Sequence, residues 1–227
     1  MRYFSRAILD ASNSHANRLL QQVVQNNYRE HQLLWQLFPE DADASRDFIY
    51  RSQQHLLRRV YYVVSDRKPK AALGWDVASK SYSPKLIEGA QLAFSLRVNP
   101  IVTRKDSAGK RHRHDVVMDA KRTMNYKQQQ LPDRKSTGQI IQQAGIDWLT
   151  SRSEKYGFEI NEKSMVVESY DQHRSYKSRS KMPIQYSTMD VAGTLEVGDV
   201  EKFSNALMSG IGPAKAFGCG LMLVRRI

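Results

Sequence analysis

The pattern of hydrophobic and polar positions predicts a chain in which strands alternate with helices. Residues 2–10 alternate between apolar and polar side chains, which is the period of a half-buried strand. Apolar positions at helical spacing predict helices at 19–24 and 30–38. Two further alternating segments, 47–53 and 57–65, predict paired strands around a short turn. The first part of the chain is therefore expected to fold as strand, helix and paired strands.

The middle of the chain contains a β-hairpin pattern followed by a helix pattern. Residues 90–102 (AQLAFSLRVNPIV) predict a strong strand that an Asn-Pro pair interrupts. The turn DSAG at 106–109 joins this strand to a basic arm at 110–117, so we expect a hairpin. Apolar side chains on one face predict a helix at 136–156.

The last part of the chain repeats the strand and helix alternation. We expect strands at 165–170 and 184–195, which flank a basic run at the tip of a second hairpin. A helix is expected at 200–208 and a final strand at 221–226. The two halves share this order of elements without residue-level identity.

The order β-α-β-β…β, followed by β…α-β-β-α-β, is that of two tandem ferredoxin-like units. The predicted fold class is α+β, with two tandem ferredoxin-like (RRM-like) domains. We place the N-terminal domain at residues 1–88 and the C-terminal domain, with the basic hairpins and a glycine-rich loop, at residues 89–227. Residues 67–76 are expected to be irregular, because Pro69 opposes a long helix there.

Composition narrows the class of protein. The chain has 227 residues, of which 41% are hydrophobic and 26% charged, and this excludes a disordered or fibrous protein. No apolar run approaches the roughly 18 residues of a membrane span, and the first residues lack the pattern of a secretory signal. The single cysteine, Cys219, excludes an intrachain disulfide and a cysteine-based metal cluster. We therefore expect a soluble intracellular protein.

The net charge of +12 is concentrated in a few segments. Residues 95–135 carry 11 basic and 4 acidic side chains, a surplus of +7. The run QHRSYKSRSK at 172–181 and the segment 202–227 each have four cations and no acid. Clustered cations with interleaved polar groups can neutralise successive phosphates, which favours nucleic-acid binding. A solvated basic surface is the alternative, and an anionic membrane is less favoured because these runs lack large apolar side chains.

Residues 26–51 (NNYREHQLLWQLFPEDADASRDFIYR) contain the first candidate for chemistry. Tyr28 and His31 are three residues apart and share a face if the helix includes both. A histidine titrates near neutrality and can pass protons in either direction, and a tyrosine can orient or donate to a phosphate oxygen. Taken alone, a Tyr-x-x-His pair is more often an amphipathic helix with a surface histidine.

Residues 209–224 (SGIGPAKAFGCGLMLV) contain four glycines within eleven residues. Glycines allow positive φ and a close approach of the backbone to a ligand, whose phosphate exposed N–H groups can hold. Neither the spacing of a Walker phosphate loop nor that of a dinucleotide fingerprint is present. The alternative is a tight connection between helix and strand that needs positive φ.

Together these segments resemble a known family. The motif YREHQLLWQLFP with the following ASRDFIYR, the strand AFSLRVNPIVTR and the segment GIGPAKAFGCGLMLV are similar to the CasE family, the CRISPR RNA-processing endoribonucleases of type I-E Cascade. The resemblance runs nearly end to end in the same order, although residues 54–85 and 118–181 match only in pattern.

The resemblance implies a metal-independent endoribonuclease, without a cofactor, in the cytoplasm. Such proteins have two ferredoxin-like domains, bind the stem-loop of the precursor CRISPR RNA and cut once at the 3′ base of the stem. The ribose 2′-OH attacks the scissile phosphate and leaves a 2′,3′-cyclic phosphate or 3′-phosphate and a 5′-OH. The protein stays on the mature guide RNA with the other Cascade subunits.

The resemblance also assigns site residues. His31 matches the catalytic histidine of the family and Tyr28 the tyrosine beside it. A glycine-rich loop near the active-site helix and the RNA is matched by Gly210, Gly212, Lys215, Gly218 and Gly220. By position and charge, the cations expected to grip the stem are Arg104, Lys105, Lys110, Arg111, Arg113, Arg174, Lys177, Arg179 and Lys181.

The residues leave several points open. In-line transesterification needs two proton transfers, and whether His31 acts as acid or base stays undecided. Arg29, Arg46 or Lys215 could offset the charge of the transition state. A metal site is disfavoured, since neither the His112 and His114 pair nor Asp10, Asp41, Asp43 and Asp47 have ligand spacing. The rival functions are a non-catalytic RNA-binding module, for which the RNP1 motif is missing, and a structural Cascade subunit.

Overall fold

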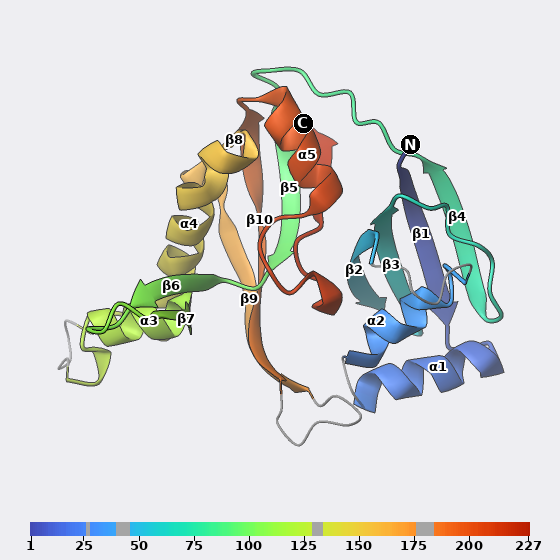
Figure 1. Ribbon diagram of the computed structural model, residues 1–227, viewed down its shortest axis with the longest axis horizontal. Helices are drawn as coiled ribbons and strands as arrows, with labels where there is room; N and C mark the ends of the chain where they lie inside the picture. Colours follow the sequence, from blue (N-terminus) through green and yellow to red (C-terminus); the bar gives the residue numbers. More distant parts are fainter. Residues whose placement is uncertain (26–27, 40–45, 129–133, 176–183) are drawn as a thin grey trace. The chain divides into compact units, whose positions relative to one another are not determined.

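A computed structural model describes residues 1–25, 28–39, 46–128, 134–175 and 184–227. The chain forms two compact units (Figure 1). The first unit comprises Met1–Lys85, the described residues within Arg174–Gln185, and Ser204–Met222. The second comprises Leu86–His173, Tyr186–Phe203 and Leu223–Ile227. Two late segments therefore belong to the first unit, and the division into domains at residues 88 and 89 stays a proposal.

The first unit contains a four-stranded antiparallel sheet in the order β2-β3-β1-β4. Its strands are β1 (Tyr3–Asp10), β2 (Phe48–His55), β3 (Arg58–Ser65) and β4 (Trp75–Ser81). The central strand β1 pairs along its whole length with β3 and along most of it with β4. This is the strand order of a ferredoxin-like unit, with irregular chain at residues 66–74 where a second helix would stand.

Two helices, α1 (Ser14–Gln25) and α2 (Tyr28–Trp35), cover this sheet (Figure 1). The side-chain oxygen of Asn13 accepts hydrogen bonds from the backbone N–H groups of His15 and Ala16, so α1 begins earlier than the apolar spacing predicted. The core between helices and sheet is built from residues with exposed fractions below 9%, among them Leu19, Leu34 and Tyr61.

A buried ion pair attaches α2 to the sheet. Glu30 on α2 is 4% exposed, and its Oε1 lies 2.6 Å from the guanidinium of Arg59 on β3. Arg59 also approaches the hydroxyl of Ser52 on β2, at 3.4 Å. Burial is the largest single influence on the Arg59 guanidinium and acts to lower its pKa. The carboxylate of Glu30 acts in the opposite direction, and the net result is a raised pKa. A helix of eight residues is too short to be stable alone, so these contacts determine its place.

The second unit contains a second antiparallel sheet in the order β11-β5-β10-β8, with β9 also paired to β10. Its strands are β5 (Gln91–Val98), β8 (Phe158–Ile160), β9 (Val166–Ser175), β10 (Ile184–Val197) and β11 (Met222–Arg226). The connecting helices are α4 (Thr137–Tyr156) and α5 (Val200–Ser209), and α5 passes from the second unit into the first at Ser204; the short η2 (Glu162–Ser164) follows β8. The fold is α+β with two tandem ferredoxin-like units, as predicted.

A hairpin and a helix are inserted between β5 and α4. The hairpin consists of β6 (Ile101–Lys105) and β7 (Arg111–Asp115), and α3 (Val116–Thr123) follows with η1 (Tyr126–Gln128). The predicted DSAG hairpin is therefore confirmed. The expected strand at 90–102 is two strands in different sheets, because Pro100 lacks the N–H that a continuous ladder needs.

One α-helix and two strands were missed by the hydrophobic pattern. The basic arm ends at Asp115, whose carboxylate accepts from the N–H groups of Val117 and Met118 and so begins α3. The strand β4 alternates too weakly to stand out, and β8 has only three residues.

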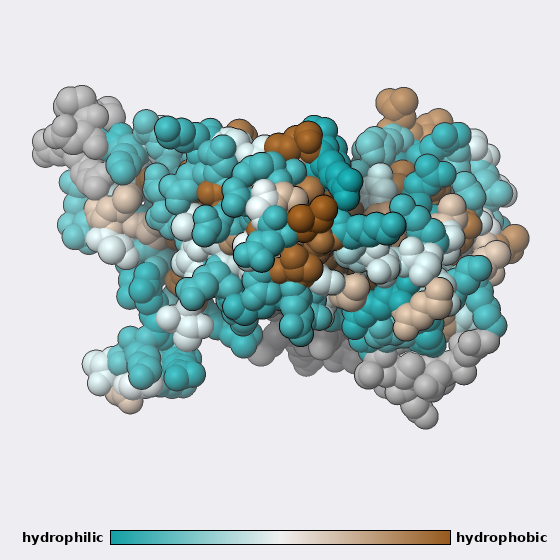
Figure 2. All heavy atoms as spheres, turned by 90° about the horizontal axis from the view of Figure 1, so that it is seen from above, coloured by the Kyte–Doolittle hydropathy of each residue, from teal (hydrophilic) through white to brown (hydrophobic). Residues whose placement is uncertain are grey.

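Most of the surface in Figure 2 is hydrophilic, with hydrophobic side chains in small groups. No helix among the described residues is long and apolar enough to cross a membrane.

We expect replacement of Gly157 to destabilise the second unit. Gly157 ends α4 with φ 75° and ψ 34°, and a Cβ there would lie 2.5 Å from the carbonyl oxygen of Asp199. Gly157→Ala should lower the free energy of unfolding by about 1–3 kcal/mol and the melting temperature accordingly. Gly138→Ala on the same helix is the control, because a Cβ there has only the hydroxyl of Ser136, at 3.9 Å. The control should stabilise by about 0.5–1 kcal/mol, and equal effects of the two changes would contradict the strain at Gly157.

Candidate active site

The side chain of His31 lies among aromatic rings where α2 meets β2. Trp35 follows His31 by one helical turn, and the two ring centroids are 6.0 Å apart in an edge arrangement. Phe48, the first residue of β2, lies 5.8 Å from the imidazole on another side. The helix supplies the first ring that contacts the imidazole, and the strand supplies the second.

The surrounding aromatic cluster consists of Trp35, Phe38 and Phe48. Phe48 stacks on Phe38 at 4.9 Å and meets Trp35 edge-on at 5.3 Å. The guanidinium of Arg67 lies over the rings of Phe38 and Trp35, at 5.4 Å and 5.9 Å. Asp47 receives two hydrogen bonds from Arg67, at 2.7 Å and 3.0 Å. The cluster is thus rigid and carries a fixed cation at its margin.

The surroundings of His31 keep its imidazole neutral. Burial, followed by the positive charge of Arg46, lowers the pKa of His31 to about 4. Its Nε2 atom is buried and has no hydrogen-bond partner among the described residues. Buried polar atoms without a partner are uncommon in folded proteins, and a catalytic role is one explanation for them. At neutral pH the side chain can accept a proton but has none to spare for a leaving group.

The other candidate groups are only partly brought to His31. Tyr28 is the first residue of α2, and its side chain lies outside the described residues. Of the three candidate cations, Arg46 is close enough to lower the pKa of His31. Arg29 is exposed on the same helix, and Lys215 is the first residue of η3 (Lys215–Phe217).

The glycine-rich segment lies against α2 and β2 within the first unit. Gly210, Gly212, Gly218 and Gly220 all have positive φ, between 75° and 97°. The hydroxyl of Tyr50 on β2 donates a hydrogen bond of 3.0 Å to the carbonyl oxygen of Ala216 in η3. The expected packing of this segment beside the helix that carries His31 is therefore confirmed.

Close packing restricts three of these glycines, and the tightest is Gly220, where a Cβ would lie 2.9 Å from the carbonyl oxygen of Ile211. A Cβ on Gly218 would lie 3.3 Å from the ring of Tyr50, and one on Gly210 would lie 3.2 Å from Ile49. Ile49 and Tyr50 are consecutive residues of β2, so their side chains point to opposite faces of the sheet. Because β2 is the edge strand, the glycine-rich segment can contact both of them. The backbone N–H of Ile211 donates to Gly220, which closes the segment into a compact loop. The glycines therefore have a structural role in shaping this loop.

The predicted RNA-binding cations occupy different parts of the chain. On the β6–β7 hairpin of the second unit, Lys105, Lys110, Arg111 and Arg113 are exposed. Arg104 is paired to the buried Asp119 through two bonds of 3.0 Å and 2.7 Å. Arg174 is an exposed residue near the end of β9, whereas Lys177, Arg179 and Lys181 lie outside the described residues.

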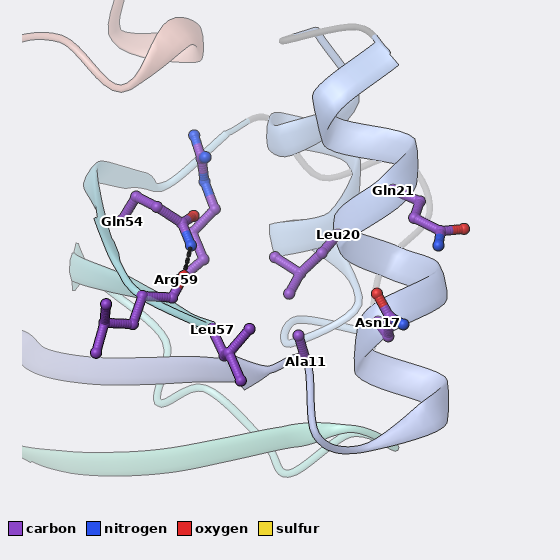
Figure 3. Close-up of a pocket in the computed structure, with 8 residues that line it drawn as sticks. Ala11, Asn17, Leu20, Gln21, Gln54, Leu57 and Arg59 are labelled. Atoms are coloured by element: carbon purple, nitrogen blue, oxygen red, sulfur yellow. Dashed lines mark hydrogen bonds between the residues drawn. The ribbon is translucent and has the colours of Figure 1, made fainter.

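The described residues give little support for a catalytic or metal site elsewhere. A groove of about 600 Å³ lies between α1 and the β2–β3 turn (Figure 3) and is lined by leucines, carboxamides and Arg59. Its hydrogen bond from Gln54 to the carbonyl of Leu56 is internal, and no lining residue is a histidine or a carboxylate. In the described part of the chain, no three His, Cys, Asp or Glu side chains gather as metal ligands would. Trp75 and Trp148 are buried.

Sequence reasoning did not single out the side chains that surround His31. Phe48 and Tyr50 were within a predicted strand, and their period of two places them on one face, which is a readable signal. The ion pair of Glu30 with Arg59 and the position of Arg67 depend on strand register, which no local pattern gives.

Comparison with known proteins identifies the relatives of the chain. A family model described as CRISPR associated protein matches residues 2–226. The CRISPR system Cascade subunit CasE of Escherichia coli (strain K12) is 29% identical over 198 residues, which cover 86% of this chain and 89% of that protein.

Solved structures share the fold along nearly the whole chain. The endoribonuclease Cse3 bound to a 19 nt RNA has a TM-score of 0.71 at 23% identity, and the match covers 98% of both chains. Thermus thermophilus Cse3, bound to an RNA representing a pre-cleavage complex, has a TM-score of 0.71 at 22% identity and covers 99% and 98%. Cas6e of Escherichia coli has a TM-score of 0.57 at 24% identity, with coverage of 99% and 100%. The chain therefore belongs to the CasE family of CRISPR-associated proteins.

Proposed function

We propose that the protein is a metal-independent endoribonuclease that binds the repeat stem-loop of precursor CRISPR RNA and cuts once at the 3′ base of the stem. The observation that carries this proposal is the neutral, half-buried His31 at the contact of α2 and β2, in a chain of the CasE family. The relatives support the substrate, because Cse3 is named an endoribonuclease and is bound to RNA in its structures. The alternative is a non-catalytic RNA-binding subunit of a CRISPR ribonucleoprotein.

The chemistry follows from the protonation state of His31. The ribose 2′-OH gives its proton to the imidazole while its oxygen attacks the adjacent phosphorus. The bond from phosphorus to the 5′-oxygen breaks, and that oxygen takes a proton from a donor, the role we assign to Tyr28 or a bound water. The products are a 2′,3′-cyclic phosphate, which can open to a 3′-phosphate, and a 5′-OH. A positioned base of this kind accelerates such a step by about 10²–10⁴-fold.

The β6–β7 hairpin supports RNA binding through its cross-strand pairs. Lys105 is directly opposite Arg111, and Arg113 lies two residues further along the same face. Like charges directly opposite each other destabilise a strand pair. A phosphate between them removes this repulsion and releases counterions. We assign Lys105, Lys110, Arg111 and Arg113 to the RNA stem, with Arg104 held by Asp119 as their support.

The glycine-rich loop is proposed to approach the RNA beside His31. Gly212 is partly exposed at positive φ, so backbone N–H groups there can face a phosphate without interference from a Cβ, whereas Gly220 is buried and shapes the loop. Lys215, or Arg46, would offset the charge that develops on the phosphate. Arg174, Lys177, Arg179 and Lys181 are proposed as further stem contacts.

The protein is proposed to act in the cytoplasm with other Cascade subunits. Relatives with this fold occur within a CRISPR RNA-guided surveillance complex, at 15% identity and a TM-score of 0.63. By this proposal the cleaved RNA stays bound, so that a single turnover produces one guide RNA and one occupied subunit.

Replacement of the histidine tests the assignment of the base. His31→Ala should lower the single-turnover cleavage rate by about 10²-fold or more, with little change in RNA affinity, because it removes proton transfer and leaves the phosphate-binding groups in place. His55→Ala, an exposed histidine at the end of β2, is the matched control. An unchanged rate for His31→Ala, with tight binding, would select the non-catalytic alternative.

The pH profile decides between an acid and a base. At subsaturating protein, the cleavage rate reports groups of the free enzyme. Because the pKa of His31 is about 4, a base should give a rate that is level from about pH 8 to pH 5 and falls below about pH 4. An acid would give the opposite slope, with the rate decreasing as the pH rises above 4. The measurement uses a pH series with the same RNA at constant ionic strength.

Removal of divalent metal tests the proposed mechanism separately. Cleavage in excess EDTA should proceed at the rate seen with Mg²⁺, once ionic strength is matched, since no step uses a Lewis acid. Loss of cleavage in EDTA that Mg²⁺ restores, with RNA affinity unchanged, would replace this mechanism by metal-assisted hydrolysis.

A further inference from the structure

A basic pocket lies at the end of α3 in the second unit. It is lined by none of the residues to which a role has been assigned so far. It has a volume of about 430 Å³. Its lining is Met118, Lys121, Arg122, Asn125, Tyr126, Gln128 and Arg134. Among the described residues of this lining none is acidic, and the pocket offers cations, amides, one aromatic ring and the exposed side chain of Met118.

The chain builds this pocket with a tight turn. The backbone N–H of Asn125 donates to Arg122 as α3 ends, and that of Gln128 donates to Asn125. Asn125 has φ 47°, a conformation that asparagine tolerates better than most residues. The turn brings the ring of Tyr126 back to the helix, with the Lys121 ammonium 5.4 Å from the ring centroid.

Two cations meet at the ring of Tyr126. The guanidinium of Arg134 lies 3.9 Å from its centroid, in addition to Lys121. Within the described residues, Lys121, Arg122 and Arg134 form no ion pair with a carboxylate, in contrast to Arg104. The ring holds the two side chains in place by cation–π contact, while their mutual repulsion stays uncompensated. Such an arrangement is stabilised by an anion.

The pKa of the Tyr126 hydroxyl is shifted in the direction that favours negative charge. Its hydrogen bond with Thr137, followed by the charges of Arg134 and Lys121, lowers the pKa of Tyr126. The pocket therefore favours negative charge beside the ring.

We propose that this pocket binds a phosphodiester of the RNA backbone, as a phosphate site separate from the cations of the β6–β7 hairpin. The inference rests on the proposed function, which supplies RNA as the ligand. RNA is favoured over an acidic peptide because α3 begins directly after β7 and packs on the hairpin whose exposed cations we assign to RNA. An RNA bound by the cations of the β6–β7 hairpin would therefore find a second set of cations, those of the α3 pocket, in the same unit.

The salt dependence of RNA binding tests the proposal. The double variant Lys121→Gln/Arg134→Gln should weaken binding of the repeat hairpin roughly 3- to 10-fold at about 0.1 M salt. It should also reduce the slope of log K against log salt by about 0.7–0.9 for each phosphate that the variant no longer neutralises. Tyr126→Leu should weaken binding while net charge stays the same, and Tyr126→Phe, which keeps the ring, should restore it.

A matched control separates a phosphate site from a general decrease in positive charge. Lys155→Gln/Lys163→Gln removes the same charge from the same unit, and Lys155 also lies over a tyrosine ring, that of Tyr156 at 5.4 Å. If the pocket variant and this control have equal affinities and slopes while the wild type binds RNA, the inference fails alone. If the wild type does not bind repeat RNA, the proposed function fails and the inference with it.

Inorganic phosphate distinguishes the source of the anion. At equal ionic strength, millimolar phosphate should leave the difference between wild type and pocket variant unchanged, because a polyanion binds far more tightly than a free ion. If phosphate lowers the affinity of the wild type to that of the variant, the pocket is a site for free phosphate, and the proposal that it binds the RNA backbone is wrong.

Discussion

The ion pair between Glu30 and Arg59 is the contact on which the candidate active site depends. It attaches an eight-residue helix to the sheet through a buried carboxylate, and removing the guanidinium partner would leave that charge uncompensated. Glu30 precedes His31 in the chain, so the helix cannot turn or slide without separating these charges. The position of the imidazole against Phe48 therefore follows from an interaction made by its neighbour in the same helical turn.

By our proposal, proton transfer uses a neutral base shielded from water, whereas phosphate binding uses exposed positive charges. The chain places these two kinds of group on different elements. His31 is neutral because aromatic side chains exclude water from it. The hairpin and the α3 pocket instead leave cations exposed and close to one another. A base within an apolar cluster is neutral because burial disfavours its charged form, and it still responds to nearby charge, as the effect of Arg46 on the pKa of His31 shows.

The fold could be predicted from the sequence to the extent that each element has its own period. The strands at 2–10 and 57–65 and the DSAG hairpin were found in this way, whereas α3 was hidden because Asp115 ends a strand and caps a helix at one residue. For the site, the motifs identified His31 and the glycine segment. The apolar surroundings that set its pKa, and the approach of Arg134 to Tyr126, come from side chains distant in sequence, and only the register of strands and turns determines them.

The hydrogen bond of Tyr50 with Ala216 joins residues 166 positions apart. On a ribosome that adds roughly 5–20 residues per second, β2 would wait about 8 to 33 seconds for the loop that covers its edge. During this interval the nascent first unit presents an uncovered strand, which is a template for pairing with other chains. Maturation of the site is thus tied to the synthesis of the segment around Ala216, and a ribosome that stalls before residue 210 leaves a product with an open sheet edge beside its histidine.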